Sequence, residues 1–302
     1  TSPPSLSQRT LAIWAAIGAT TIYALNHTIA KGVMPHYVQP FAFILLRVTG
    51  AAALFWMISF AGPRQSVEKR DWGRLLLCAL LGMVINMLSF FKGLELSTPV
   101  NSSVLVTVTP IIVAIFSYFL IRERLTRLRG LGILLGLAGA LALIFLNETT
   151  GMNAPNIPLG NFLFIVNASS YGLYLILVKK LIEKYHPFVL MRWLFTLAVF
   201  INLPITLPEF LEIDWPSIPA WGLASIAFVV IGTTFLTYLF NVFALTQLKA
   251  STVSAFIYGQ PVIGIGFALL TGKDTLSALD VLAMLLVMSG VYLVSRRTIP
   301  GP

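Results

Sequence analysis

Long apolar runs, separated by short polar or Pro/Gly-rich breaks, follow one another along almost the whole chain. A helix needs roughly 20 apolar residues to cross the hydrocarbon core of a bilayer. Most of these runs reach that length, and the breaks between them are short. We therefore predict ten membrane-spanning helices, over residues 11–31, 40–60, 72–91, 98–121, 128–146, 158–180, 187–207, 219–244, 251–271 and 278–295.

Composition agrees with a chain that faces lipid. The 302 residues are 57% hydrophobic and 10% charged, whereas soluble domains carry about 25% charged residues. The ten predicted helices use nearly all of the sequence, which excludes a large soluble domain. The first apolar run is longer than the hydrophobic stretch of a signal peptide, about 7–15 residues, and lacks a convincing cleavage site, so we expect a retained helix.

The basic residues gather on one side of the predicted membrane. With both termini inside, 15 of the 20 Lys and Arg residues lie in inner segments and three lie in outer loops, as the positive-inside rule expects. We therefore expect cytoplasmic termini, and a net charge of +9 that binds anionic headgroups rather than nucleic acid. The inner set is Arg9, Arg64, Lys69, Arg70, Arg74, Arg122, Arg124, Arg127, Arg129, Lys179, Lys180, Lys184, Lys249, Arg296 and Arg297, and the outer set is Lys31, Lys92 and Lys273.

The two halves of the chain share a sequence pattern. When Gly93 is aligned with Ala244, Pro110 falls on Pro261, and the Arg-Glu turn at 122–123 falls on the Lys-Asp turn at 273–274. Each half has five predicted helices, an odd number, so the second half enters the membrane in the opposite orientation. We predict an all-α integral membrane protein of two inverted five-helix repeats, residues 1–147 and 158–302, joined by an outer linker over 148–157.

Three motifs resemble one transporter family. They are Ala-Leu-Asn-His-Thr-Ile-Ala-Lys at 24–31, Arg-Glu-Arg-Leu-Thr at 122–126 and Tyr-Gly-Gln-Pro-Val-Ile at 258–263. Together they resemble EamA-domain proteins of the drug/metabolite transporter superfamily. The resemblance implies a ten-helix carrier that exports small metabolites, such as amino acids or their derivatives, across a bacterial inner membrane. It also implies a central cavity lined by helices 1, 3, 4, 6, 8 and 9. The second repeat departs from the pattern where Tyr174 falls opposite Asn26.

Polar side chains inside the predicted helices are candidates for substrate binding. Such groups are costly in a bilayer unless they are paired or face a watery cavity. Amides need partners for a donor and an acceptor, and tyrosine offers a flat ring with a polar tip. Hydrogen bonding between helices is the alternative interpretation. The candidates are Thr20, Tyr23, Asn26, Asn86, Ser89, Ser103, Thr107, Asn167, Tyr171, Thr234, Tyr238, Tyr258 and Gln260.

Two prolines and two arginines inside the predicted helices suggest further functional roles. Pro110 and Pro261 occupy equivalent positions, where each removes one backbone hydrogen bond, so we interpret them as fixed kinks or as hinges for alternating access. Arg47 and Arg192 are candidates for contact with a carboxylate or phosphate, with snorkelling toward headgroups as the alternative.

The sequence is as informative in what it lacks. No Asp or Glu lies near the middle of a predicted span, so we expect no dedicated carboxylate proton site. Facilitated diffusion, exchange, and coupling through His27 or the substrate's own charge stay open. Walker-type, His-Glu-x-x-His and Gly-x-Ser-x-Gly motifs are absent, so we predict no enzyme, no cofactor or metal, and no ATPase partner.

Two alternatives to a metabolite carrier remain. A phosphorylated or nucleotide-type substrate requires several basic residues in the cavity, and only Arg47, Arg192, Lys92 and Lys31 are near enough. A membrane-embedded enzyme or scaffold acting on lipid requires a cluster of acids, histidines or metal ligands at one interface, which the sequence does not show.

Overall fold

The computed structural model describes residues 6–60, 62, 65–121, 126–146, 154–247, 256 and 259–295. This part of the chain is helical and contains no β-strand. Its elements are α1 (Leu6–Val33), α2 (Pro40–Ser59), η1 (Lys69–Asp71), α3 (Trp72–Ala79), η2 (Leu80–Ile85), α4 (Asn86–Leu96), α5 (Pro99–Leu105), η3 (Val106–Val108), α6 (Thr109–Ile121), α7 (Arg127–Phe145), α8 (Ile157–Ile182), α9 (Pro187–Leu211), η4 (Trp215–Ser217), α10 (Ala220–Ala227), η5 (Phe228–Leu236), α11 (Thr237–Gln247), α13 (Gln260–Leu270) and α14 (Ala278–Ser295).

Eight helical segments of the described chain are long and apolar enough to cross a membrane. They are α2, η1 to α4, α5 to α6, α7, α8, α9, α10 to α11, and α14. The 28-residue α1 is not among them, because Asn26 and its polar neighbours lower its hydropathy. The predicted ninth span lies partly outside the described residues, and α13 is its described part. The structure therefore confirms an all-helical membrane protein, and the count of ten remains a prediction.

The predicted span over residues 187–207 ends too early, because α9 continues to Leu211 through Pro204 and Pro208. A proline inside a helix removes the hydrogen bond to the carbonyl four residues earlier. Glu209, in the last turn, accepts hydrogen bonds from the two backbone N–H groups at residues 41 and 42. These contacts hold the end of α9 against the start of α2.

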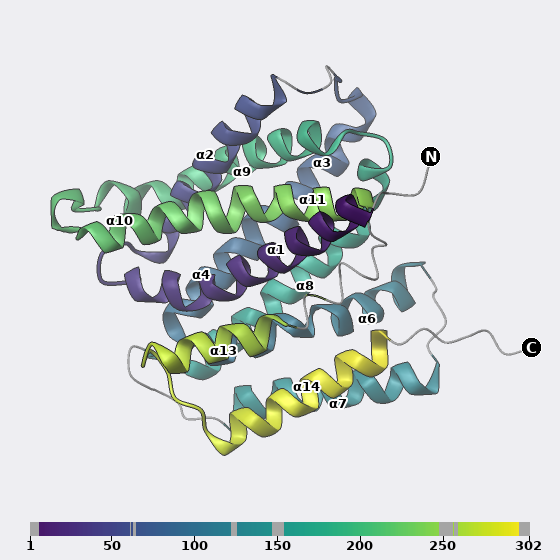
Figure 1. The fold of residues 1–302 in the computed structure, drawn as a ribbon, viewed down its shortest axis with the longest axis vertical. Coiled ribbons are helices and arrows are strands. Elements are labelled where there is room, and N and C mark those ends of the chain that lie inside the picture. The colour runs from purple at the N-terminus through teal and green to yellow at the C-terminus, as the bar shows by residue number, and fades with distance from the viewer. Residues whose placement is uncertain are drawn as a thin grey trace, which may run out of the picture.

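The described elements repeat between the two halves at the positions that the sequence alignment predicts. Matching Gly93 with Ala244 places α4 on α11, with the same first and last residues, and the start of α7 on the start of α14. Helix pairs repeat too: α4 packs on α8 as α11 packs on α1, and α6 packs on α8 as α13 packs on α1. The α2/α9 and α7/α14 pairs lie at opposite ends of the long axis (Figure 1).

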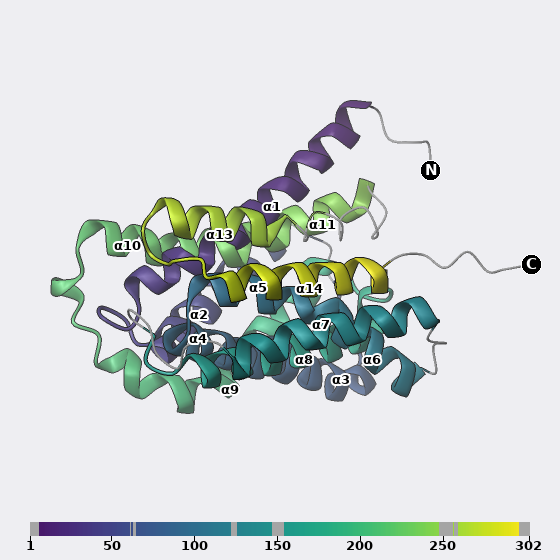
Figure 2. The same ribbon diagram turned by 90° about the horizontal axis from the view of Figure 1, so that it is seen from below.

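Helices α7 and α14 lie side by side, with glycines at their contact (Figure 2). A Cβ added to Gly290 would lie 2.5 Å from the backbone oxygen of Gly132 and 2.6 Å from the nitrogen of Gly136. A Cβ added to Gly139 would lie 2.8 Å from the backbone oxygen of Ala283. Small residues of this kind let helix backbones approach closely in a membrane, where van der Waals packing supplies much of the attraction.

Candidate functional site

Arg47 is buried between α2, α4 and η5, with 5% of its surface exposed. Its Nε donates a hydrogen bond to the Thr234 hydroxyl at 2.6 Å, and its guanidinium carbon lies 5.7 Å from the centre of the Phe91 ring. No acidic side chain or hydrogen-bond acceptor of the described chain contacts its two terminal nitrogens. A buried guanidinium without a carboxylate partner is costly, and in a membrane protein this makes Arg47 a candidate for a functional role.

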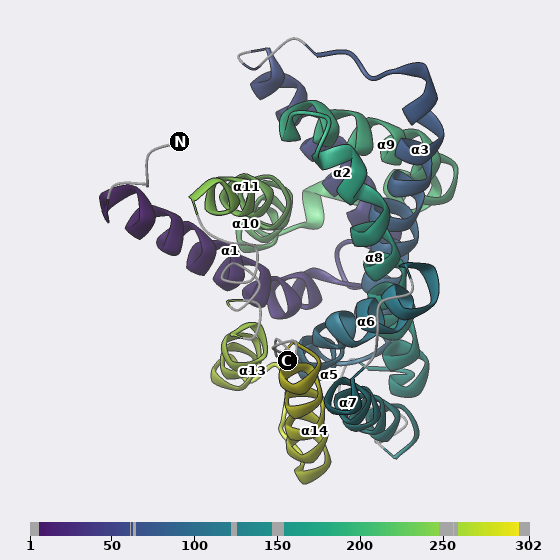
Figure 3. The same cartoon turned by 90° about the vertical axis from the view of Figure 1, so that its right-hand side faces the viewer.

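Three tyrosines lie in the same region of the bundle as this arginine. Tyr23 in α1 and Tyr238 in α11 lie near enough to Arg47 to influence its charge, and Tyr171 in α8 lies near these two tyrosines. Figure 3 shows the α1, α10 and α11 helices on one side and α2, α8 and α9 on the other. Elements from both halves of the chain therefore contribute to one polar group, which we call the Arg47 cluster: Tyr23, Arg47, Tyr171, Thr234 and Tyr238.

Asn26 is fully buried, and neither its Oδ1 nor its Nδ2 has a hydrogen-bond partner in the described chain. A helix turns about 100° per residue, so Asn26 lies on the surface of α1 between Ile22 and Tyr23. Ile22 packs against Gly232 of η5, and Tyr23 belongs to the Arg47 cluster. Asn26 therefore faces the same region of the bundle. Buried amide atoms normally have partners, so the two unpartnered atoms make Asn26 a candidate for ligand contact.

Irregular helical turns place part of this cluster. The segments η2 and η5 are π-helical, and the repeat alignment matches them, with Leu80 on Ile231. A π-turn adds a residue and shifts the backbone hydrogen bonds. In η5, the Thr234 hydroxyl donates to the carbonyl of Val229 at 3.2 Å while it accepts from Arg47. In η2, the carbonyl of Leu81 accepts from the Ser170 hydroxyl of α8.

Several candidates hold helices together instead of facing an open site. The side-chain nitrogen of Asn86 donates to the backbone oxygen of Asn167 at 3.3 Å, and that of Asn167 donates to the backbone oxygen of Asn86 at 2.8 Å. The Thr107 hydroxyl donates to the carbonyl of Val104, within its own turn, at 2.6 Å. The alternative interpretation, hydrogen bonding between or within helices, describes these contacts.

Ser103 is buried with no partner for its hydroxyl in the described chain. It lies at a close crossing with α13, where a Cβ added to Gly264 would come within 2.7 Å of its oxygen. The structure does not bring this serine into contact with the Arg47 cluster. Of the remaining candidates, Thr20 and Ser89 are buried, Gln260 is half-buried at the start of α13, and Tyr258 lies outside the described residues.

Pro110 lies in the middle of the helical span from α5 to α6, and Pro261 lies in the first turn of α13. Pro110 is the second residue of α6, directly after the 3₁₀ turn η3, and Pro261 is the second residue of α13. Proline is tolerated in the first helical turn because its missing N–H would have no helical partner there. The 3₁₀ turn directly before Pro110 is a local irregularity of the kind that a proline produces within a helix. That the two prolines act as hinges stays a prediction.

Arg192, in α9, lies away from the Arg47 cluster and packs against the C-terminal end of α2. Its guanidinium carbon lies 4.8 Å from the ring centre of Trp56 and 5.8 Å from that of Trp193. Its terminal nitrogens donate to the Ser59 hydroxyl at 3.2 Å and to the backbone oxygen of Gln65 at 3.3 Å. It borders a pocket of about 510 Å³ lined by Ser59, Phe60, Gln65, Ser66, Val67, Trp72, Arg192 and Trp193.

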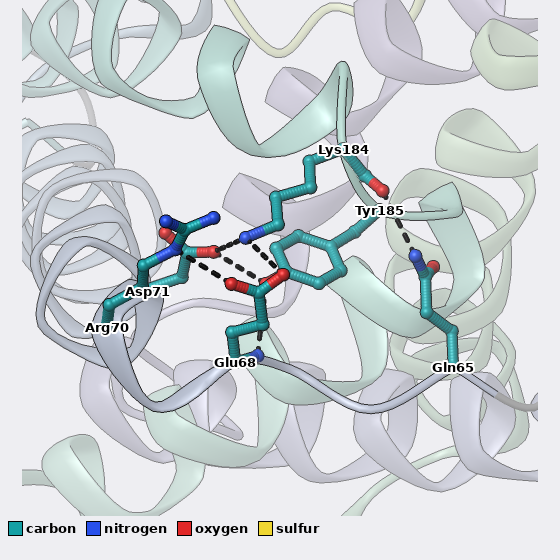
Figure 4. A network of polar contacts seen from close by, with 6 residues as sticks. All are labelled: Gln65, Glu68, Arg70, Asp71, Lys184 and Tyr185. Atoms are coloured by element: carbon teal, nitrogen blue, oxygen red, sulfur yellow. Dashed lines mark hydrogen bonds and ion pairs between the residues drawn. The ribbon is translucent and has the colours of Figure 1, made fainter.

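A polar network joins the two halves beside this pocket (Figure 4). Lys184 Nζ lies 2.5 Å from a carboxylate oxygen of Asp71 and 2.7 Å from one of Glu68, and the Tyr185 hydroxyl donates to the same Asp71 oxygen at 2.6 Å. Hydrogen bonds from Lys184 lower the pKa of both carboxyls. Partial desolvation opposes charge on Lys184, but its hydrogen bonds to Asp71 and Glu68 raise the pKa of its ammonium overall.

Other contacts close the end of the bundle where α1 ends. Lys31 Nζ donates to the backbone oxygens of Leu94 at 2.6 Å and Glu95 at 2.7 Å, and so caps α4. Asp274 accepts from the backbone N–H of Val100, at the start of α5, at 2.9 Å. Burial raises the pKa of the Asp274 carboxyl, against the hydrogen bonds that it accepts.

Two residues that contact the predicted candidates were not predicted from the sequence. Phe91 faces Arg47, and no local signal distinguishes it from the other phenylalanines. Ser102 bonds to His27 Nδ1 at 2.7 Å, and the His27 ring makes edge contacts with Tyr23 and Phe90. His27 is therefore a packed, hydrogen-bonded residue. The described residues contain no group of His, Cys, Asp and Glu able to hold a metal ion.

The chain is similar over nearly its whole length to proteins named as uncharacterized transporters. It is 26% identical over 285 residues to an uncharacterized transporter of Archaeoglobus fulgidus, covering 94% of this chain and 99% of that one. It is 20% identical over 291 residues to the uncharacterized transporter YetK of Bacillus subtilis, covering 95% and 88%. A solved structure titled "Crystal structure of protein" shares the fold, with a TM-score of 0.61 at 19% identity and 96% coverage of both chains.

The family comparison matches each half separately. The pattern of the EamA-like transporter family matches residues 10–145 and again residues 158–296, which correspond to the two halves whose helices repeat in the structure. The resemblance noted in the sequence is thereby confirmed. The chain belongs to the EamA-like transporter family.

Proposed function

We propose that this membrane transporter is a ten-helix, alternating-access carrier that exports a small polar or amphipathic metabolite, such as an amino acid or derivative, across the bacterial inner membrane. The observation that carries the proposal is the Arg47 cluster, where helices from both halves bring an unpaired cation and three tyrosines together inside an apolar bundle. Polar groups at this depth are expected to serve a substrate pathway.

The repeated architecture supports alternating access. The pairs α4/α8 and α11/α1 are equivalent when the halves are exchanged. If the halves are inverted in the membrane, exchanging their two conformations converts an opening on one face into an opening on the other. The Arg47 cluster draws on both halves, so such a rearrangement changes its exposure from one side to the other.

Solute exchange in proteoliposomes tests the carrier function. Vesicles containing the purified protein are loaded with one unlabelled L-amino acid at a time, and uptake of the same labelled amino acid is measured. We expect accelerated uptake for at least one amino acid, relative to protein-free vesicles. If none of the twenty exchanges, the amino-acid substrate class is wrong.

Growth tests the direction of transport. Cells that overproduce an exporter tolerate higher concentrations of its substrate, supplied as a toxic analogue or as a dipeptide that is hydrolysed inside the cell. We expect greater tolerance than in cells with an empty vector. Greater sensitivity to the same compound would instead indicate import.

A further inference from the structure

We propose that the Arg47 cluster binds the carboxylate of a small amino-acid-type metabolite; this inference rests on the carrier function proposed above. The binding group is the edge of the Arg47 guanidinium that carries its two terminal nitrogens. Nε is already engaged by Thr234 at 2.6 Å, which fixes the orientation of the plane. The free edge has the geometry of a two-point contact with a carboxylate.

Arg47 is the available cation in this part of the described bundle. Lys31 is engaged by two backbone carbonyls, and Lys92 pairs with Glu95. Arg192 is engaged by Ser59 and Gln65 and stacked on tryptophans elsewhere. A single guanidinium matches the single charge of a carboxylate. A phosphorylated ligand carries more charge and would require several of these cations together.

The fold itself does not require a charge at this position. Counted from the proline that begins each helix, Arg47 of α2 matches Leu194 of α9, and the repeat alignment matches Thr234 with Met83. The pair of positions related to Arg47 and Thr234 by exchange of the two halves is therefore occupied by two apolar residues, Leu194 and Met83. A buried unpaired charge destabilises a protein. Because only one of the two equivalent pairs carries such a charge, we attribute Arg47 to ligand binding and not to the stability of the fold.

The neighbouring residues suit the remainder of such a molecule. Asn26 offers an unpartnered acceptor and donor, and the acceptor matches an α-ammonium group. The half-buried rings of Tyr23, Tyr171 and Tyr238 offer flat surfaces for an apolar side chain and for the ammonium charge. Together they fit a zwitterion whose carboxylate lies on Arg47.

Thermal unfolding of the detergent-purified protein tests the proposal. Cys78 is the single cysteine and is fully buried, so a maleimide dye that fluoresces on reaction reports unfolding. The probes are the twenty L-amino acids, each paired with its α-carboxamide. We expect one or more acids to raise the unfolding temperature and their carboxamides to leave it unchanged. Arg47→Met abolishes the shift, and the surface control Arg70→Met retains it.

The unliganded variants separate binding from a structural role. If Arg47 awaits a ligand, Arg47→Met unfolds at the same temperature as the native protein or a higher one. Arg47→Lys keeps the charge without the fork, and we expect it to reduce the ligand shift without abolishing it. A clear loss of unliganded stability in both variants would assign Arg47 a structural role and overturn the proposal.

The ligand results distinguish this proposal from the carrier function. Equal shifts by acids and carboxamides, a retained shift in Arg47→Met, or no shift by any acid would each overturn the carboxylate site. In that case, carboxamides and amines are tested for exchange in proteoliposomes that contain either the native protein or Arg47→Met. Exchange of such a compound by both proteins would support the carrier function and reject only the carboxylate site.

Discussion

Lys184 connects the two halves of the chain through ionised side chains at one end of the bundle. Its partners Glu68 and Asp71 precede α3 in the first half, and Lys184 itself follows α8 in the second. The lowered pKa of the two carboxyls means that they stabilise the folded state above their unfolded pKa, and that this stabilisation is lost as pH falls through the folded values. The raised pKa of Lys184 has the opposite sense: stabilisation is full below the unfolded pKa and lost as pH rises through the folded value.

We therefore expect Lys184→Met to lower the unfolding temperature of the purified protein between about pH 5 and about pH 10, the interval between ordinary carboxyl and lysine pKa values. The loss is small, because exposed ion pairs contribute little and are screened by salt. Tryptophan fluorescence during heating measures it. The difference from native protein should shrink below pH 4 and in high salt.

Lys180→Met is the matched control, since Lys180 is an exposed lysine in the last turn of α8, the helix that Lys184 follows. It should leave the pH dependence of unfolding unchanged. A loss of stability at Lys184→Met that persists at pH 3 would show that the side chain acts through packing instead of charge.

At the scale of elements, the contact between α7 and α14 depends on the absence of a side chain at Gly290. We expect Gly290→Ala to destabilise the protein by roughly 1–3 kcal/mol, the usual cost of overpacking, because the new Cβ meets backbone atoms of Gly132 and Gly136. Chemical or thermal unfolding in detergent measures the change.

Gly130→Ala provides the control in α7 itself. Nothing lies within 4 Å of a Cβ added at Gly130, so the higher helix propensity of alanine should be neutral or stabilise by up to about 1 kcal/mol. Equal destabilisation at both positions would mean that the helix contact is not what makes Gly290 sensitive.

Element boundaries were largely predictable, since apolar runs and helix-starting prolines mark them locally. Pro40, Pro99 and Pro187 each begin a helix, and the repeat alignment anticipates the match of α4 with α11. The π-helical segments η2 and η5 were not predictable, because no local residue pattern marks a π-turn and their side-chain contacts with Ser170 and Arg47 come from distant elements. The partners of Arg47 were missed for the same reason: Thr234 lies 187 residues away along the chain.

At the scale of the whole molecule, the central question is whether the two similar halves face opposite ways. The beginning of α1 and the end of α14 lie on the same side in Figure 1, which fits an even number of crossings. An inverted repeat makes a stricter demand: equivalent loops of the two halves must lie on opposite faces of the membrane. His36 and Glu183 each follow the first helix of a half, and Lys69 and Glu212 each follow the second.

Single-cysteine labelling tests this demand. In a Cys78→Ala background, we expect a membrane-impermeant maleimide applied to spheroplasts to label His36→Cys and Glu212→Cys but not Lys69→Cys or Glu183→Cys. All four sites are exposed, so permeabilised cells should show labelling at every one, which controls for access. The two loops of each equivalent pair are expected to label differently because an odd number of membrane crossings separates them. Labelling of positions 36 and 183 from the same face would contradict inversion, and alternating access through exchange of the two halves' conformations would lose its structural basis.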